Sequence, residues 1–228
     1  MADDGHVGVE LVGRGIRLSR GGVEILRGVD VSLRGGERLA LTGPSGSGKT
    51  VLLSVLAGLA RPEVGTVLLD GRPLADVPSL RRRLGVVFQG YGLVALLTAA
   101  ENVELPLLAA RVPASRARIR AREALELVGL ADRAEHLVEE LSGGQQQRAA
   151  VARALVVRPE VLLADEPTAE QDVDHRTATL DAILAAASFG TAVLLATHDP
   201  VVAARCDRVV HLEAGVLRRA PPVGTAQR

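Results

Sequence analysis

The sequence predicts an α/β fold with a mostly parallel buried sheet, an N-terminal antiparallel β subdomain and an inserted helical subdomain. Three observations lead to it. Apolar runs of strand length at 84–88, 161–164 and 192–196 are each followed by polar residues, which is typical of parallel strands buried on both faces. Residues 9–41 alternate partly and contain turns, which favours short strands. From about 98 to 157 the pattern becomes helical.

The first half of the chain predicts strands around one helix. The segment VEILRGVDVSL (23–33) alternates partly, residues 34–37 form a turn, and 38–41 enter a buried strand. A glycine-rich turn at 43–48 opens a helix, which Gly58 is expected to end. A second strand pair follows at 64–74, and Asp70-Gly71 predicts its hairpin turn.

The second half predicts a helical insertion between buried strands. The strand at 84–88 ends at Gln89, and residues 114–128 read as a helix with charged residues on one side. The other side of that helix is expected to carry the apolar residues Ile119, Ala121, Leu125 and Val128. We expect a single domain over 1–228. Its core comprises 9–88 and 158–218, its helical subdomain 89–157, and its flexible tail 219–228.

Composition excludes several function classes. The 27 basic and 27 acidic residues cancel, which disfavours sequence-independent binding to a phosphate backbone. The aromatic residues are Phe88, Tyr91 and Phe189, too few for a platform that stacks single-stranded bases. We therefore expect no nucleic-acid partner.

The same reading favours a cytosolic chain. The single cysteine, Cys206, excludes an internal disulfide framework and a multi-cysteine zinc site. The acidic N-terminus lacks an apolar signal region, and no stretch approaches the roughly 20 apolar residues of a membrane-spanning helix. If the protein works at a membrane, another chain is expected to do the spanning.

Residues 43–50, GPSGSGKT, fit the phosphate-loop pattern G-x-x-x-x-G-K-[ST] between a predicted strand and helix. The glycines let backbone N–H groups turn toward phosphates at a helix N-terminus. Lys49 is expected to bridge β- and γ-phosphates, and the Thr50 hydroxyl to ligate Mg²⁺. Lys49 is the only lysine among 27 basic residues, at a position where a guanidinium would not replace a compact charge. The expected nucleotide contacts here are Gly43, Pro44, Ser45, Gly46, Ser47, Gly48, Lys49, Thr50 and Val51.

Two acidic residues end the apolar strand 161–164. Asp165 is expected to hold Mg²⁺ through water, and Glu166 to act as the general base that polarises the attacking water. The alternative is a pair of acids that merely caps a following helix.

The segment LSGGQ, 141–145, directly precedes a helical stretch. Ser142 is placed to cap that helix, and the glycines allow the backbone to approach a γ-phosphate. In isolation the five residues could also be an ordinary glycine turn. The expected contacts are Ser142, Gly143, Gly144 and Gln145.

Over about residues 9–218 the chain resembles the ATP-binding cassette (ABC) ATPases. The phosphate loop, Gln89, LSGGQ, Asp165-Glu166 and His198 occur in that family's order. The resemblance implies a phosphate-loop NTPase (RecA-like) core that hydrolyses ATP with Mg²⁺ to drive transport. It also implies a head-to-tail dimer, either a homodimer or a paired cassette, with ATP between the phosphate loop of one subunit and Ser142–Gln145 of the other.

The same match assigns two further residues. Gln89 is expected to sense Mg²⁺ and the attacking water, and His198 to reach the γ-phosphate. The alternatives are a polar residue at a strand end for Gln89 and a structural histidine for His198.

Two segments depart from the family pattern. Residues 15–20 lack the usual adenine-stacking aromatic, so Arg17 or Leu18 would supply a face instead, and GTP use stays open. Residues 169–172 read AEQD; Asp172 is retained for the contact across the dimer, while Glu170 and Gln171 add polarity near the interface. An active but slow ATPase is expected.

The stretch 84–108 is similar to cassettes of lipoprotein-release, macrolide-efflux and cell-division complexes. This similarity implies an integral-membrane permease partner and a peripheral position on the cytoplasmic face of the plasma (inner) membrane. The segment from Gln89 to Leu97 is expected to line the groove that receives the permease, through Tyr91, Leu93, Val94, Leu96 and Leu97. Its alternative is burial of those side chains under the helical subdomain.

Export or extraction from the membrane is the favoured activity. A mechanical or regulatory ATPase of the cell-division type and an amino-acid-type importer subunit are the alternatives. Soluble cassette proteins of DNA repair, chromosome structure or translation are disfavoured, because the chain has one phosphate loop, one cysteine and no long heptad tract.

Overall fold

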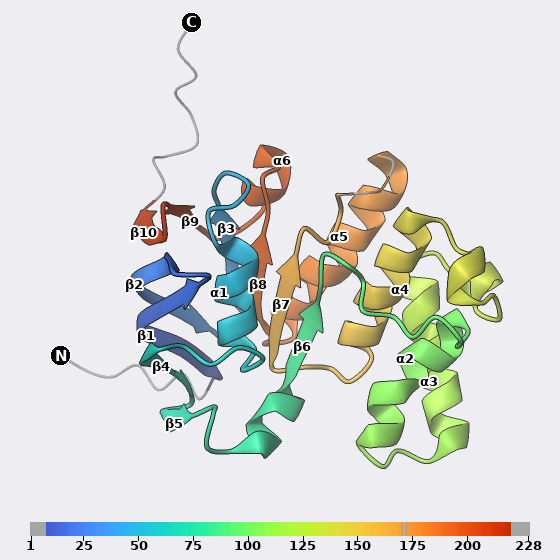
Figure 1. The fold of residues 1–228 in the computed structure, drawn as a ribbon. Helices are drawn as coiled ribbons and strands as arrows, with labels where there is room; N and C mark the ends of the chain where they lie inside the picture. The colour runs from blue at the N-terminus through green and yellow to red at the C-terminus, as the bar shows by residue number, and fades with distance from the viewer. Residues whose placement is uncertain (1–7, 170, 172, 220–228) are drawn as a thin grey trace, which may run out of the picture.

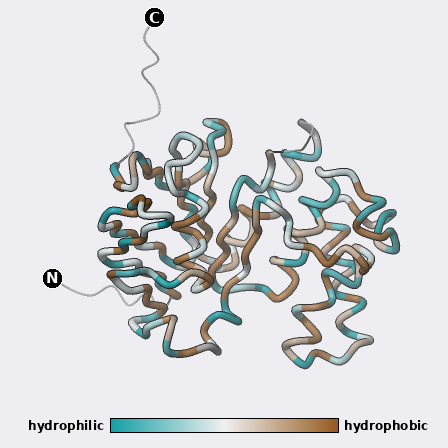
Figure 2. Tube along the Cα trace, viewed as in Figure 1, coloured by the Kyte–Doolittle hydropathy of each residue, from teal (hydrophilic) through white to brown (hydrophobic). Residues whose placement is uncertain are grey.

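A six-stranded sheet forms the centre of the computed structural model, which describes residues 8–169, 171 and 173–219 (Figure 1). Its strand order is β10-β9-β3-β8-β7-β6, and β9, β3, β8, β7 and β6 run parallel. The bounds are β3 (Arg38–Thr42), β6 (Leu84–Val87), β7 (Val161–Asp165), β8 (Ala192–Ala196), β9 (Arg208–Glu213) and β10 (Val216–Arg219). The apolar runs that predicted buried strands are β6, β7 and β8, and Figure 2 colours the chain by hydropathy. The mostly parallel sheet is confirmed.

A four-stranded antiparallel sheet of order β2-β1-β4-β5 covers one side. Its strands are β1 (Glu10–Arg20), β2 (Val23–Arg34), β4 (Val64–Leu69) and β5 (Arg72–Pro73). The expectation of short strands at 9–41 is confirmed for β3, which has five residues, but was wrong for β1 and β2, which have 11 and 12 residues. Register shifts between Gly13 and Ile16, where Gly15 has φ +58°, break the alternation and make long strands read as short ones. The predicted Asp70-Gly71 turn joins β4 to β5.

The central sheet separates two apolar cores. In β7, Val161 and Leu163 face the antiparallel sheet and α1 (Lys49–Leu56), whereas Leu162 and Ala164 face the helices α4 (Gly143–Leu155) and α5 (Val173–Ser188). Helix α1 ends at Leu56, and Gly58 follows with φ +69°, as the sequence predicted. This sandwich positions the carboxyl ends of the parallel strands between α1 and α4.

The inserted helices pack on the second core. They are α2 (Ala99–Ala109), α3 (Ala114–Leu127) and α4, with short 3₁₀ helices η2 (Ala131–Arg133) and η3 (Val138–Glu140) before α4. Ile119 was wrongly expected on the apolar side of α3: it is 59% exposed. The buried side carries Ala117, Ala121, Ala124 and Leu125, and Ile119 lies two residues from Ala121, about 200° around the helix.

The remaining elements complete the connections. The 3₁₀ helix η1 (Pro78–Arg83) precedes β6, and the four-residue α6 (Pro200–Ala203) lies between β8 and β9. Among the described residues, no helix is both long and apolar enough to cross a membrane. Of the predicted tail, 220–228 lies outside the described residues, and Arg219 belongs to β10.

Candidate nucleotide-binding site

Four predicted motifs lie at one edge of the central sheet. Because β3, β8, β7 and β6 are parallel neighbours, their carboxyl ends meet at the same edge. Beyond these ends come the glycine-rich loop after Thr42, His198 after β8, Glu166 after β7 and Gln89 after β6. Sequence positions more than 150 residues apart, such as Gly43 and His198, thus come from neighbouring strands.

The loop 43–48 folds tightly over the start of α1. Gly43 has φ +149°, and a Cβ atom there would lie 2.2 Å from the Leu212 carbonyl oxygen, so this position requires glycine. Lys49 is 8% exposed, and its Nζ donates to the carbonyl oxygens of Gly43 at 2.8 Å and Pro44 at 3.2 Å. The loop therefore surrounds the only ammonium side chain in the protein.

This loop has the properties of a phosphate site. The Ser47 hydroxyl is buried and has no hydrogen-bond partner among the described residues. Gly46 and Gly48 have positive φ and lie before the first turn of α1, where helix amides carry a partial positive charge. An anion held by these donors would satisfy both the amides and the orphaned hydroxyl.

Thr50 and Asp165 form an oxygen-rich pair beside the loop. The Thr50 hydroxyl donates to Asp165 Oδ2 at 2.5 Å, and Asp165 is only 4% exposed. Burial raises the pKa of the Asp165 carboxyl, and the charge of Glu166 adds to this, while the bond from Thr50 opposes it. A hydroxyl and a buried carboxylate are hard oxygen ligands, so the pair fits Mg²⁺.

Glu166 lies on a strained turn next to Asp165. Its φ is +46°, which is rare for a residue with a side chain, and its N–H donates to the Ala196 carbonyl oxygen at 2.9 Å. Glu166 Oε1 lies 2.8 Å from His198 Nδ1, and the His198 side chain is 72% exposed. The structure therefore brings Glu166 and His198 together just beyond the carboxyl ends of β7 and β8.

Gln89 is exposed two residues beyond the end of β6. Because Val87 pairs with Ala164 in the parallel register, the backbone of Gln89 follows the strand next to the one that ends at Asp165. The structure therefore places Gln89 at the same sheet edge as the acidic pair.

The Ser142–Gln145 motif begins α4, away from the glycine-rich loop. Ser142 Oγ accepts from the Gln145 N–H at 3.3 Å, and Gln145 Oε1 accepts from the Ser142 N–H at 2.8 Å. This capping box confirms Ser142 as the helix cap. Helices α1 and α4 belong to different cores, on opposite faces of the central sheet (Figure 1).

In the two segments that depart from the family pattern, three side chains are placed by the structure. Leu18 is not available as an adenine face, because it is 6% exposed within the core. Arg17 is exposed, and its Nη1 donates to Glu24 Oε1 at 2.8 Å. Gln171, which was expected to add polarity near the dimer interface, is buried in this protomer: its amide donates to the Pro167 carbonyl oxygen, and its Oε1 accepts from the Thr179 hydroxyl. Glu170 and Asp172 lie outside the described residues.

Two residues to which the sequence analysis gave no role contact the segment after Gln89. Asn102 and Arg153 both bond the backbone of the segment that follows Gln89. Asn102 could have been found from the sequence, because it is a polar residue that lies with Ala99 and Val103 on a buried face of the helix. Arg153 gave no such signal, because arginine is common in this sequence.

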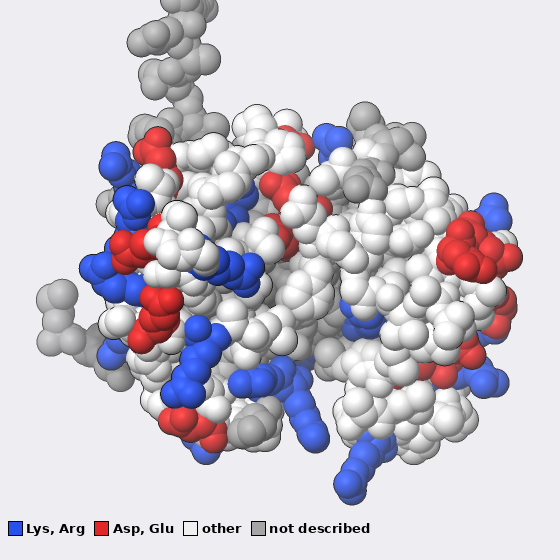
Figure 3. Space-filling model, in the orientation of Figure 1, with Lys and Arg blue, Asp and Glu red and all other residues white. Residues whose placement is uncertain are grey.

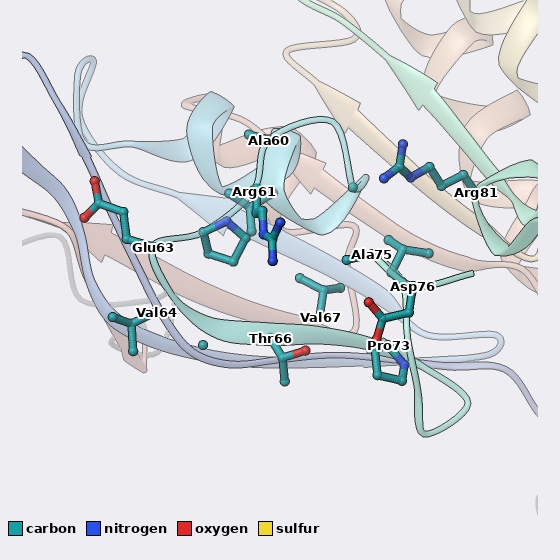
Figure 4. A pocket seen from close by; sticks show the side chains of 15 residues that line it. Ala60, Arg61, Glu63, Val64, Thr66, Val67, Pro73, Ala75, Asp76 and Arg81 are labelled. Carbon is teal, nitrogen blue, oxygen red and sulfur yellow. The ribbon is translucent and has the colours of Figure 1, made fainter. Parts of the chain in front are cut away.

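A cavity of about 460 Å³ lies at the other end of α1 (Figure 4). Its lining includes Val55, Gly58, Arg61, Val67 and Arg81, and none of the predicted nucleotide contacts. We assign the nucleotide site to the sheet edge, because the phosphate-binding amides, Lys49 and the acidic pair lie there.

The fold and this edge define a phosphate-loop nucleotide-binding protein. Residues 26–169 match the profile of the family described as ABC transporter. The lipoprotein-releasing system ATP-binding protein LolD of Bordetella pertussis is 46% identical over 204 residues, which cover 86% of this chain and 88% of that protein. LolD of Paramagnetospirillum magneticum is 44% identical, covering 90% of this chain and 93% of its own length.

A solved structure agrees with these relatives. The dimeric ATP-binding cassette MJ0796, in a post-hydrolysis state bound to ADP and Pi, has a TM-score of 0.87 and 33% identity. It covers 94% of this chain and 100% of its own. The chain belongs to the ABC transporter family. It is an ATP-binding subunit with ATPase activity, and ATP and Mg²⁺ are the substrate and the metal of that activity.

Proposed function

We propose that this chain powers a lipoprotein-release or efflux-type transporter as a head-to-tail dimer bound to a separate permease on the cytoplasmic face of the inner membrane. The observation that carries the proposal is the placement of Lys49, Asp165, Glu166 and His198 at one sheet edge. The similarity to LolD over 86–90% of the chain supports the lipoprotein-release type.

The loop Gly43–Val51 would hold the phosphates of ATP. Lys49 Nζ, now bonded to two loop carbonyls, would exchange them for β- and γ-phosphate oxygens, which are stronger acceptors. The buried Ser47 hydroxyl and the amides at the start of α1 would complete the cradle. These contacts fix the γ-phosphate over the carboxyl ends of β7 and β8.

Thr50, Asp165 and Gln89 would hold Mg²⁺, with Asp165 acting through water. Bound Mg²⁺ neutralises phosphate charge that develops during hydrolysis. Glu166 would take a proton from the attacking water, whose oxygen bonds to the γ-phosphorus as the bond to ADP breaks. His198, anchored by Glu166 at 2.8 Å, would donate a hydrogen bond to the γ-phosphate.

The second phosphate-binding motif, Ser142–Gln145, acts across the dimer. Ser142, Gly143, Gly144 and Gln145 begin α4 on the opposite sheet face from α1. A head-to-tail dimer would bring Ser142–Gln145 of one protomer to the ATP held by the other, which explains two distant phosphate-binding motifs in one chain. The matched MJ0796 cassette structure is described as dimeric.

The permease would contact the turn that follows Gln89. Leu96 is 88% exposed and Val94 is 44% exposed, whereas Tyr91 and Leu93 are partly buried against the helical core. The turn therefore offers Val94 and Leu96 as contacts for the permease, while Tyr91 and Leu93 pack against the helical core. In Figure 3 most of the viewed surface over α4 and α2 is uncharged, which suits apolar docking.

Purification of the tagged chain from detergent-solubilised membranes of its own cell tests this proposal. We expect a permease with four spans and a large extracytoplasmic domain in stoichiometric amount. A permease with an importer architecture would favour the amino-acid importer instead. Recovery of a cell-wall-regulating partner without a transported substrate would favour the mechanical ATPase. Purification without any integral-membrane protein would contradict the proposal.

A further inference from the structure

Arg153, in the last turn of α4, bonds the segment that follows Gln89. Its Nη1 donates to the Gly92 carbonyl oxygen at 2.6 Å, and its Nη2 donates to the Tyr91 carbonyl oxygen at 3.0 Å. Tyr91 and Gly92 have φ of +58° and +62°, and such conformations persist where surrounding contacts fix them. Burial lowers the pKa of Arg153, and no carboxylate in the described residues forms an ion pair with it. These two carbonyls therefore receive a guanidinium that is costly to bury.

Gln146, in the first turn of α4, reaches the same segment through η3. Its Nε2 donates to the carbonyl oxygens of Val138 and Leu141, both at 3.0 Å. The Val138 N–H in turn donates to the Leu97 carbonyl oxygen at 3.3 Å. The start of α4, directly after Ser142–Gln145, is thus two hydrogen bonds from Leu97.

Asn102 closes the exposed turn between these two attachments. It is fully buried in α2, and its Oδ1 accepts from the Val94 N–H at 2.8 Å. Its Nδ2 donates to the carbonyl oxygens of Val94 at 3.1 Å and Thr98 at 3.0 Å. Asn102 therefore holds the backbone at Val94 and Thr98, on both sides of the exposed Leu96.

We infer that Gln146 and Arg153 are positioning residues that join the segment 91–98 to α4 as one rigid unit. The helix would then hold the exposed turn at Leu96 and the phosphate-binding start at Ser142–Gln145 in a fixed relation. Force applied to Leu96 would reach Ser142 along one helix about 20 Å long, without a flexible joint. The role of this unit in ATP turnover rests on the proposed function.

Hydrogen exchange of the full chain without nucleotide tests the unit directly. Gln146→Met and Arg153→Gln remove side-chain donors to carbonyls, and each is expected to speed exchange of the 91–98 amides roughly 5- to 10-fold. Arg153→Lys keeps a cationic donor and should restore most of the protection. Gln147→Met is the control for Gln146, because the Gln147 Nε2 is buried without a partner. Arg120→Gln is the control for Arg153, since Arg120 donates to Val156 at 2.6 Å. Neither control should change exchange at 91–98.

Steady-state ATP hydrolysis supplies the second readout. Both test variants should lower kcat about 5-fold or more with KM for ATP unchanged, since the Lys49 loop is untouched. Unchanged exchange at 91–98, or faster exchange with kcat equal to that of the parent chain, would overturn the inference. Absence of hydrolysis by the parent chain would instead contradict the proposed function, and the exchange data alone would then decide the inference.

Discussion

Glu166 Oε1 lies 2.8 Å from His198 Nδ1, at the carboxyl ends of two adjacent parallel strands. The Glu166 side chain is 12% exposed, whereas the His198 side chain is 72% exposed. The carboxylate therefore anchors one imidazole nitrogen while the ring stays open to an incoming phosphate. The backbone of Glu166, at φ +46°, is held by its bond to Ala196. This pair is the centre of the hydrolytic site that we propose.

Replacement of Lys49 by arginine should weaken ATP binding. The Lys49 Nζ fits within 2.8 and 3.2 Å of two loop carbonyls, and a planar guanidinium cannot occupy the same space. We expect a loss of roughly 10- to 100-fold in affinity, the value of one charge-assisted contact. Isothermal titration with ATP and Mg²⁺ measures it.

The matched control for Lys49→Arg is Arg61→Lys, because Arg61 lines the cavity at the other end of α1 (Figure 4). Its ATP affinity should equal that of the parent chain. An ATP affinity of Lys49→Arg equal to that of the parent chain would contradict the assignment of Lys49 to the phosphate site.

Leu96→Asp should reduce attachment of the chain to the membrane while sparing its fold. Because Leu96 is 88% exposed, the substitution should change the free energy of unfolding by less than about 0.5 kcal/mol. We expect unchanged ATP affinity, with most of the variant lost from the membrane fraction after cell fractionation. Leu127→Asp, at a 67% exposed leucine at the end of α3, should stay membrane-bound. Equal membrane recovery of Leu96→Asp would contradict the docking proposal.

Asp207→Asn should lower stability at neutral pH and lose this effect in acid. Arg38 donates to Asp207 through Nε at 3.1 Å and Nη2 at 2.7 Å, and these bonds hold the pKa of the Asp207 carboxyl below its usual value. A carboxyl with a depressed folded pKa stabilises the fold above its unfolded pKa, near 3.9, and loses this contribution as pH falls through the folded pKa.

The pair is partly exposed, so water screens it, and the expected loss is about 0.5–1 kcal/mol at pH 7. Urea unfolding at several pH values measures the difference between parent and variant. The difference should shrink below about pH 4. A difference that stays constant from pH 7 to pH 3 would show that the carboxylate charge is not its source.

The Cys206 thiol should react slowly with alkylating agents. Burial, with a smaller contribution from Asp207, raises the pKa of Cys206 to about 11. At pH 8 only about 0.1% of the thiol is then ionised, and the thiolate is the reacting form. Iodoacetamide labelling followed by mass spectrometry should show a rate that rises about tenfold per pH unit between 8 and 10. A plateau below pH 9 would contradict the raised pKa.

The sequence predicted the central sheet and the loop because each has a strong local signal. Residues 161–164 of β7 and all of β8 are unbroken apolar runs, and the Lys49 pattern requires glycines at fixed spacing. The length of β1 was missed, because a bulge around Gly15 breaks the alternation on which strand prediction depends. Ile119 was placed on the wrong side of α3, because it is apolar and close in sequence to Ala121 but lies on a different side of the helix.

Contacts between distant segments could not be predicted in detail. The 2.5 Å contact of Thr50 with Asp165 joins residues 115 positions apart, and only the strand order brings them together. The burial of Gln171 depends on Thr179 and Pro167, which carry no local signal for such a contact. The attachment of Arg153 to Tyr91 and Gly92 likewise depends on where α4 packs.

ATP hydrolysis by Glu166→Gln tests the central claim most directly. Glutamine keeps the size of the side chain but cannot take a proton from water. We expect the hydrolysis rate to fall by roughly 10²- to 10⁴-fold while ATP still binds, so that an ATP-bound dimer accumulates in size-exclusion chromatography. Hydrolysis at the parent rate, with no accumulated dimer, would contradict the assignment of Glu166 as the general base.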